Sequence, residues 1–310
     1  MINKTEISSF KDYGKVVCIS NGIIEAYVTV DVGPRIIRFG YVDSQNFMRD
    51  DRKAPGVDTT PEYEEYFGKG TFFENLGGHR IWLSPESYPE TYAPGNTPVN
   101  FELTENGAIF TPDPELANGV QKQLEIKMSE GAAEMFVSMR VTNIGEETKR
   151  FAIWGLTVAA LNGTEIIPMN TNDTGLLANR IIGVWPYTDM SDDRIYWGKK
   201  YVTLTQKTED RSPIKLGFDL NGGKVYYVLN DEVFCKTYET LHPDATYPDG
   251  GCSFETYTNN NFIEIESLGE LKDVAKGETS ELTECWTLCK KPCDVDFRND
   301  ASIDAFLKEI

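Results

Sequence analysis

The sequence predicts an all-β protein, a large antiparallel β-sandwich with one or two short helices. Roughly fifteen or more short segments alternate apolar and polar residues with the two-residue period of a strand. Turn signals such as Asn118-Gly119 and Glu130-Gly131 separate many of these segments. No helical segments alternate with them, which excludes a doubly wound α/β fold.

The first half of the chain is expected to begin as a meander. The Asn21-Gly22 pair predicts a tight hairpin turn between the first two strands, and Gly33-Pro34 interrupts the pattern before the third. Residues 43–70 are polar and rich in Asp, Pro and Gly, so we expect a long loop with a short acidic turn at 60–65. Strands are expected at residues 15–20, 23–30, 35–41, 101–103, 107–110, 121–128, 135–141 and 150–158.

The second half repeats the same alternation and adds two candidate helices. One is residues 175–182; the other is residues 302–310, where apolar residues recur at helical spacing behind an Asn/Asp/Ser start. Strands are expected at residues 165–169, 194–197, 201–205, 215–218, 224–229, 233–238, 251–257, 262–267 and 279–288. No linker divides the chain, so we expect one domain over residues 1–310.

Composition and charge narrow the class of protein. A net charge of −19 argues against nucleic acid and anionic membrane surfaces as partners, since both would repel the chain. No run of about 18 apolar residues could span a membrane. The first ten residues lack the apolar stretch of a signal peptide, so a cytoplasmic location is expected. The six cysteines form no CxxC pair, and free thiols are the expectation.

The most informative segment is residues 75–87. It brings Asn75, His79, Arg80, Trp82 and Glu86 into about a dozen residues, and the only other histidine, His242, lies in a turn-rich run. The preceding glycine pair would let backbone and ligand approach closely. If the segment is a strand, His79 and Arg80 point to opposite faces, so both cannot face one cleft. A structural His-Arg pair is the alternative interpretation.

A second group of polar residues follows later in the chain. On a strand over residues 262–267, Glu264 and Glu266 share one face, and a solvated sheet face would show the same pattern. Glu255 and Tyr257 precede them on a strand that we expect to be the hairpin neighbour. Carboxylates and aromatic faces together are typical of carbohydrate sites, where carboxylates bind hydroxyls or transfer protons at the anomeric centre.

Two further residues are weaker candidates, and several site types are unsupported. Trp154 is a candidate platform for a sugar ring, although tryptophans in a large sandwich are more often core; Lys236 is a candidate ligand of sugar oxygens, although a solvated lysine is the more ordinary interpretation. No P-loop, GxGxxG, HExxH, GxSxG or EF-hand spacing is present. We therefore expect no cofactor and no metal ion.

Several motifs resemble those of a family of uncharacterised bacterial galactose mutarotase-like proteins (the DUF4380 type). They are Gly77-Gly-His-Arg-Ile-Trp82 with Pro85-Glu86, the run 247–258, and Ile263-Glu-Ile-Glu-Ser-Leu-Gly269 followed by Lys276-Gly-Glu278. The resemblance spans roughly residues 20–290. It implies the large β-sandwich shared with aldose 1-epimerases and a concave sheet face that binds a small-molecule carbohydrate.

The resemblance also implies roles for particular residues. Glu266 looks like the epimerase base that takes the anomeric proton, with Glu264 as the fallback. His79-Arg80 looks like the Asn-Arg pair of those enzymes, and Trp154 stands where they carry the acid histidine. His79 would then have to supply the acid, with Arg80 and Lys236 orienting oxygens. The alternatives are a sugar-binding protein without catalysis and a glycoside hydrolase or lyase.

Overall fold

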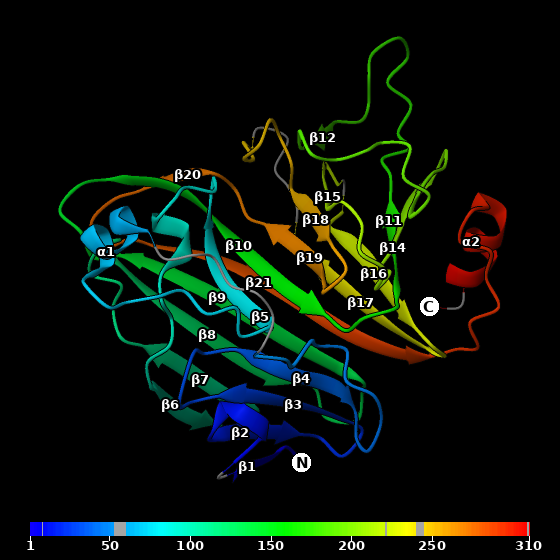
Figure 1. The fold of residues 1–310 in the computed structure, drawn as a ribbon. Helices are drawn as coiled ribbons and strands as arrows, with labels where there is room; N and C mark the ends of the chain where they lie inside the picture. Colours follow the sequence, from blue (N-terminus) through cyan, green and yellow to red (C-terminus); the bar gives the residue numbers. More distant parts are fainter. Residues whose placement is uncertain (8, 53–59, 221, 240–244, 309) are drawn as a thin grey trace.

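The computed structural model of the chain is built from two stacked antiparallel β-sheets (Figure 1). It describes residues 1–7, 9–52, 60–220, 222–239, 245–308 and 310. His242, expected in a loop, lies outside these residues. The all-β sandwich predicted from strand periodicity is confirmed: the described strands pair antiparallel, and the helices are short.

The first sheet carries the candidate functional site on its outer face. Its strand order is β1-β2-β3-β4-β5-β10-β19-β18-β15-β12, and β20 pairs with one end of β10. The strands are β1 (Asn3–Ile7), β2 (Val16–Ser20), β3 (Ile24–Thr29), β4 (Ile36–Tyr41), β5 (Gly78–Ser84), β10 (Lys149–Ala159), β12 (Ile182–Val184), β15 (Ile214–Phe218), β18 (Phe254–Thr258), β19 (Ile263–Leu268) and β20 (Lys272–Val274).

The second sheet completes the sandwich. Its order is β13-β14-β11-β16-β17-β21-β9-β8-β7-β6, so its centre is β17 and β21. The strands are β6 (Val99–Thr104), β7 (Gly107–Pro112), β8 (Val120–Met128), β9 (Glu134–Asn143), β11 (Thr164–Pro168), β13 (Ile195–Trp197), β14 (Tyr201–Thr205), β16 (Lys224–Leu229), β17 (Glu232–Tyr238) and β21 (Thr279–Lys290).

The main hydrophobic core lies between the two sheets. Phe39 of β4 contacts Phe234 of β17 and Trp286 of β21 with ring centroids 5.5 and 5.2 Å apart. All three side chains are buried, and each large buried aromatic side chain contributes roughly 1.5–3 kcal/mol relative to an exposed one. Alternate residues of the central strands supply this core, as strand geometry requires.

The helices are peripheral. α1 (Pro61–Phe67) begins at Thr60, whose hydroxyl accepts a hydrogen bond from the Tyr63 amide, and Pro61 occupies the first turn. α2 (Asp300–Leu307) confirms the predicted C-terminal helix, and its Ile303 packs against the second sheet. Short 3₁₀ turns lie at Lys11–Tyr13 and Glu90–Tyr92.

The helix predicted at residues 175–182 is wrong. Leu176 and Leu177 there are exposed, so no apolar surface covers the segment and stabilises a helix. The segment instead projects from the top of the molecule in Figure 1, between β11 and β12. Within the described part of the chain, no helix is long and apolar enough to cross a membrane.

Candidate functional site

Five neighbouring strands of the first sheet direct a set of polar side chains to its outer face. Leu156 of β10 lies opposite Arg80 of β5 and opposite Glu266 of β19, which in turn lies opposite Glu255 of β18. Residues paired across strands point to the same face, so these side chains share one side of the sheet. The next row on that face runs from Glu264 through Tyr257 to Lys215 on β15.

A cavity of about 350 Å³ opens over this face. Its size suits a small polar ligand such as a monosaccharide. Aromatic and charged side chains line it: Phe73, Asn75, Arg80, Trp82, Glu86, Tyr92, Trp154, Leu156, Tyr187, Lys215, Tyr257, Asn259, Phe262 and Glu264.

Lys215 is the best-connected charge beside the cavity. Its Nζ donates to Glu266 Oε2 at 3.0 Å and lies 2.9 Å from Glu255 Oε2. It also stands 4.5 Å above the centre of the Trp154 ring, a cation–π contact. Burial alone would lower the pKa of Lys215, but the carboxylates of Glu266 and Glu255 outweigh it and raise that pKa. Lys215 is therefore a permanent cation and a hydrogen-bond donor.

Arg80 forms the opposite wall. Its Nη2 donates to Glu264 Oε1 at 3.3 Å, and its guanidinium lies 4.1 Å from the centre of the Trp82 ring. Only 3% of Arg80 is exposed, yet its Nε and Nη1 have no partner among the described residues. A buried guanidinium with free donors is costly, so these two nitrogens are available for a ligand.

The rest of the lining is aromatic. Trp82 and Trp154 meet edge to face with centroids 5.5 Å apart, and Tyr92 packs edge to face on Trp82 at 5.1 Å. The Tyr92 hydroxyl donates a short hydrogen bond to Glu86 at the rim. On the other side, Tyr257 accepts from the Asn259 amide at 3.2 Å. Such rings bury the apolar faces of a sugar, while the charged groups bind its hydroxyls.

The three buried glutamates titrate together because they surround two cations. Burial raises the pKa of Glu264, and the Arg80 charge only partly reverses this. Burial also raises the pKa of Glu255 and of Glu266 against the opposing effect of Lys215. Three carboxylates thus face two cations, and burial favours the protonated form of each carboxyl group.

His79 and Lys236, assigned to the site from the sequence, lie elsewhere. His79 is fully buried between the sheets, where Nδ1 bonds the Thr157 hydroxyl at 2.9 Å and the ring meets Trp286 edge to face. Burial and the Lys236 charge hold the pKa of His79 well below its usual value. The expectation that His79 supplies an acid to the cleft is therefore wrong, because strand alternation sends His79 inward and Arg80 outward.

Lys236 is also an interior residue. Its Nζ donates to the Ile265 carbonyl at 2.9 Å and lies 3.2 Å from Glu284 Oε1, beneath the sheet. It cannot orient a ligand on the outer face, contrary to the expectation. Lys236 is neither a solvated lysine nor a ligand of sugar oxygens, because its side chain is 1% exposed and points between the sheets.

Glu266 lies on the expected face but below the cavity floor. It is fully buried, and its Oε2 accepts hydrogen bonds from Lys215 and from Trp154 Nε1 at 2.8 Å. Glu264 lines the cavity, and Glu266 is absent from its lining. The carboxylate in reach of a ligand is therefore Glu264, the fallback, rather than Glu266.

The glycine pair before His79 serves backbone packing instead of ligand approach. A Cβ on Gly77 would lie 2.4 Å from the Arg49 carbonyl oxygen, and one on Gly78 would lie 2.4 Å from that of Ile36. Both glycines also have positive φ angles. The double glycine thus lets β5 start against its neighbours, which sets the register that directs Arg80 outward.

Half of the residues that line the cavity were not predicted from the sequence. Lys215 stands in a short strand whose other residues give no polar alternation, so nothing in the sequence marked it. The loops bring in the others: Phe73, Tyr92, Tyr187, Asn259 and Phe262, together with Leu156 of β10. Of the predicted residues, the cavity is lined by Asn75, Arg80, Trp82, Glu86, Trp154, Tyr257 and Glu264. Glu255 lies beneath it, paired with Lys215. Among described residues, no group of three His, Cys, Asp or Glu could hold a metal ion.

Comparisons with solved structures identify the fold. A proposed aldose 1-epimerase from Klebsiella pneumoniae superposes with a TM-score of 0.60 at 12% identity, over 100% of this chain and 86% of that one. A galactose mutarotase-like protein from Lactobacillus casei gives 0.55 at 12%, over 88% and 100%. A proposed aldose 1-epimerase from Escherichia coli gives 0.55 at 12%, over 94% and 100%. The chain has the galactose mutarotase-like fold.

The fold is shared at identities too low to carry a function with it. No protein-family model matches the sequence, and a search of curated proteins finds no significant match. The narrower resemblance to the DUF4380 type therefore rests on the quoted motifs alone. What the galactose mutarotase-like fold does in this chain has to be argued from the cavity.

Proposed function

We propose that this protein binds a small carbohydrate in the cavity on the outer face of β5, β10, β19, β18 and β15. The observation that carries the proposal is the pairing of an aromatic lining with the buried guanidinium of Arg80, whose Nε and Nη1 lack partners among the described residues. A pyranose offers matching chemistry, since its ring faces are apolar and its edge carries hydroxyls that accept and donate. The fold neighbours, described as aldose 1-epimerases, favour the same ligand class.

The charged side chains of the cavity bind different atoms of the sugar. Arg80 and Lys215 are cations that stay protonated and donate to sugar oxygens from two walls, whereas Glu264 accepts from a hydroxyl between them. A hydrogen bond to a charged group contributes about 1.5–3 kcal/mol, so two or three of them suffice for measurable affinity.

Proton transfer at the anomeric centre is the second candidate function, and one observation favours it. Glu264 lines the cavity with a pKa that burial raises toward neutral, as a general base requires. In this mechanism Glu264 takes the proton of the anomeric hydroxyl, the ring C–O bond breaks, and the Lys215 ammonium hydrogen-bonds the departing ring oxygen. Closing the ring on the other face and returning the proton completes anomer exchange.

Ligand-detected NMR against a panel of aldoses tests the binding proposal. We expect saturation transfer to at least one aldose and a loss of affinity of about 3- to 10-fold in Tyr187→Ala, which removes one exposed ring from the lining. Leu177→Ala, an exposed change in the connection between β11 and β12 and outside the lining, is the control and should leave affinity unchanged. Absence of transfer to every aldose would overturn the proposal.

Exchange spectroscopy on the same sugars tests the catalytic candidate. Glu264→Gln should slow anomer exchange by about 100-fold or more if the carboxylate is the base, since general-base groups contribute on this scale. Because the pKa of Glu264 is raised, the wild-type rate should increase as pH rises through that pKa. Glu281→Gln, on an exposed strand position of the other sheet, is the matched control. An exchange rate equal to that in buffer alone leaves binding as the function.

A further inference from the structure

A second cavity, of about 300 Å³, lies on the other side of Arg80 and Trp82. It opens between β5 of the first sheet and β8 of the second, and the loops 93–97 and 112–117 cover it. Arg80 and Trp82 line both this cavity and the proposed sugar cavity, so the two sites adjoin.

Arg35 is the main charged group of the second cavity. It is 7% exposed, and the only hydrogen bond of its guanidinium to the described residues runs from Nη1 to the neighbouring Pro34 carbonyl at 2.9 Å. Its Nε has no partner, and no described carboxylate forms an ion pair with it. A buried guanidinium without a carboxylate is rare, because desolvation of the charge is not compensated.

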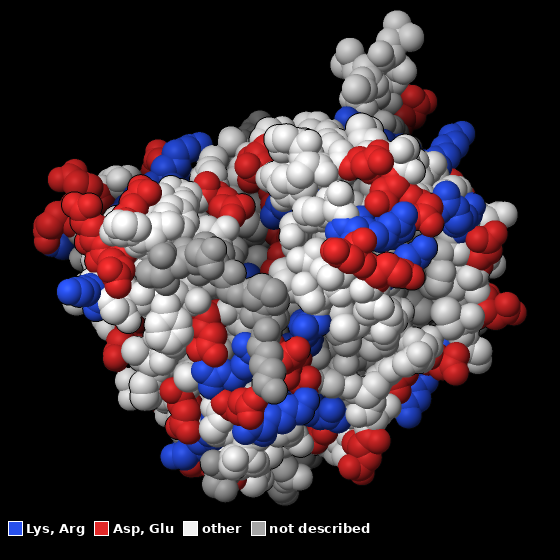
Figure 2. Space-filling model, viewed as in Figure 1, with Lys and Arg blue, Asp and Glu red and all other residues white. Residues whose placement is uncertain are grey.

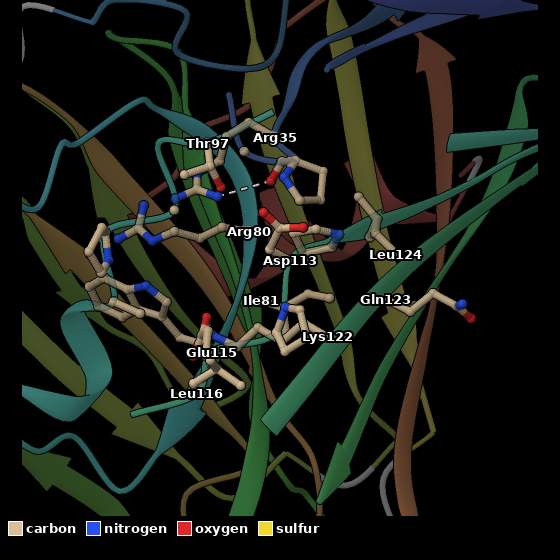
Figure 3. A pocket seen from close by; sticks show the side chains of 18 of the residues that line it. Arg35, Arg80, Ile81, Thr97, Asp113, Glu115, Leu116, Lys122, Gln123 and Leu124 are labelled. Atoms are coloured by element: carbon tan, nitrogen blue, oxygen red, sulfur yellow. Dashed lines mark hydrogen bonds and ion pairs between the residues drawn. The ribbon is translucent and has the colours of Figure 1, made fainter. Parts of the chain in front are cut away.

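Arg80 adds a second buried cation at the same end. Figure 3 shows Arg35 and Arg80 at one end of the cavity, with Lys122, Gln123 and Leu124 at the other. Burial and the Arg80 charge together lower the pKa of Arg35 to about 9, which means that the two guanidiniums repel each other. The repulsion is an unfavourable feature of the empty site, and an anion placed between them would remove it.

The described acidic residues of the lining form no ion pair with Arg35. Glu115 is already paired with Lys122 at 2.6 Å and accepts from the Asn118 amide at 2.8 Å. Asp113 is exposed to solvent. Elsewhere on the surface, acidic and basic side chains are interspersed, as Figure 2 shows for one face. Arg80 is paired with Glu264 through Nη2 alone, so its Nε and Nη1, together with Arg35 Nε, remain buried donors without a partner among the described residues.

We infer that the cavity between Arg35 and Arg80 binds the phosphate or carboxylate group of an anionic sugar whose ring occupies the neighbouring cavity. Guanidinium groups bind both anions through paired N–H donors, so the shared chemistry is an oxyanion. This inference rests on the proposed sugar-binding function and narrows its ligand to sugar phosphates or sugar acids.

Calorimetric titration with four probes tests the inference: inorganic phosphate, a neutral aldose, its 6-phosphate and its uronic acid. We expect at least one anionic sugar to bind about 10-fold or more tighter than the neutral aldose, the scale of one charge-assisted hydrogen-bond pair. The better of the two anionic sugars identifies the source of the oxyanion. Equal affinity for neutral and anionic sugars would overturn the inference while leaving the proposed function in place.

Variants at three positions, Arg35, Arg38 and Leu116, complete the test. Arg35→Met should reduce the ratio of the two dissociation constants to near one, whereas Arg38→Met on β4, where Arg38 pairs with Glu25, should keep it. Leu116 is 80% exposed at the cavity lining, so changes there should not unfold the protein. Leu116→Glu should weaken anionic sugars several-fold relative to the isosteric Leu116→Gln.

The outcomes separate the two proposals. Phosphate binding that Leu116→Glu weakens, without binding of any sugar, would overturn the proposed function and the anionic-sugar assignment together. Sugar binding with identical behaviour of Leu116→Glu and Leu116→Gln, and no effect of Arg35→Met, would overturn the subsite alone.

Discussion

Two buried lysines lie on opposite faces of β19 and differ in almost every respect. Lys215, on the outer face, contacts the side chains of Glu266 and Glu255, which raise its pKa. Lys236, on the inner face, bonds the backbone of β19 and the single carboxylate of Glu284. Burial therefore dominates there and lowers its pKa.

The difference shows that the two faces of the first sheet have separate roles: the outer face forms the candidate site, and the inner face holds the strands together. Polar side chains of the outer face end at a cavity and keep free donors, whereas Lys236 on the inner face reaches the Gly155 and Ile265 carbonyls and Ser267. The outer set can exchange solvent for a ligand. The inner set ties β17 to β10 and β19 across the core, which holds the strands that carry the outer set.

The largest expected effect is on stability, at the inner lysine. Lys236→Met should lower the free energy of unfolding by about 3–5 kcal/mol, because Glu284 would be left as an uncompensated buried charge. Chemical denaturation of the wild type and the variant measures this loss of unfolding free energy. The double variant Lys236→Met/Glu284→Gln should recover most of the loss; an equally unstable double variant would contradict the assignment of the cost to the unpaired carboxylate.

At the outer lysine we expect the effect on ligand affinity instead. Lys215→Met should weaken binding of the preferred sugar by about 10-fold or more, since a charged donor is removed. Its stability cost should be smaller than that at Lys236, because the raised pKa values of Glu255 and Glu266 let them take up protons. Titration calorimetry measures the sugar affinity, and chemical denaturation of the same sample measures the free energy of unfolding. Unchanged sugar affinity would remove Lys215 from the site.

The buried Glu165 should make the stability of the protein depend on pH. Burial raises the pKa of Glu165 to about 8, above its unfolded value near 4.5. The folded state therefore holds a proton that the unfolded state releases, and stability from this group falls as pH rises from about 4.5 through 8. Glu165→Gln should be nearly neutral at pH 4 and stabilising at pH 9, by on the order of 5 kcal/mol, since one unit of pKa shift is about 1.4 kcal/mol and the shift is from 4.5 to about 8. Melting temperatures of both proteins across this range check the sign.

The smallest expected signal comes from His79. Because burial and Lys236 depress its pKa, the imidazole should stay neutral from pH 8 to pH 5 in the folded protein. Its ring resonances, assigned by their loss in His79→Asn, should not move across that range. A titration midpoint near 6.5 would show that the ring reaches solvent, as a role in the cleft would require.

The sequence predicted the sandwich well because its information is local. Strand periodicity and turn residues located most strands, including the alternation that puts Glu264 and Glu266 on one face. The same alternation predicted that His79 and Arg80 point apart. It could not say which of them faces the cavity, because the adjoining strands that bury His79 come from distant parts of the chain.

The site itself depends on contacts that local patterns do not contain. Lys215 is defined by its partners on β18 and β19, and Tyr187 lies in the connection between β12 and β13. Glu266 and Glu264 look equivalent in sequence. Only the packing of Lys215 and Trp154 against Glu266 shows that Glu264 is the member that lines the cavity.

The most direct test of the proposed site is a crystal structure of the protein with a bound aldose. The ring should lie against the aromatic lining with one oxygen within hydrogen-bond distance of Glu264 and another within reach of Arg80 or Lys215. A sugar bound elsewhere, with this cavity occupied by water alone at saturating ligand, would contradict the account.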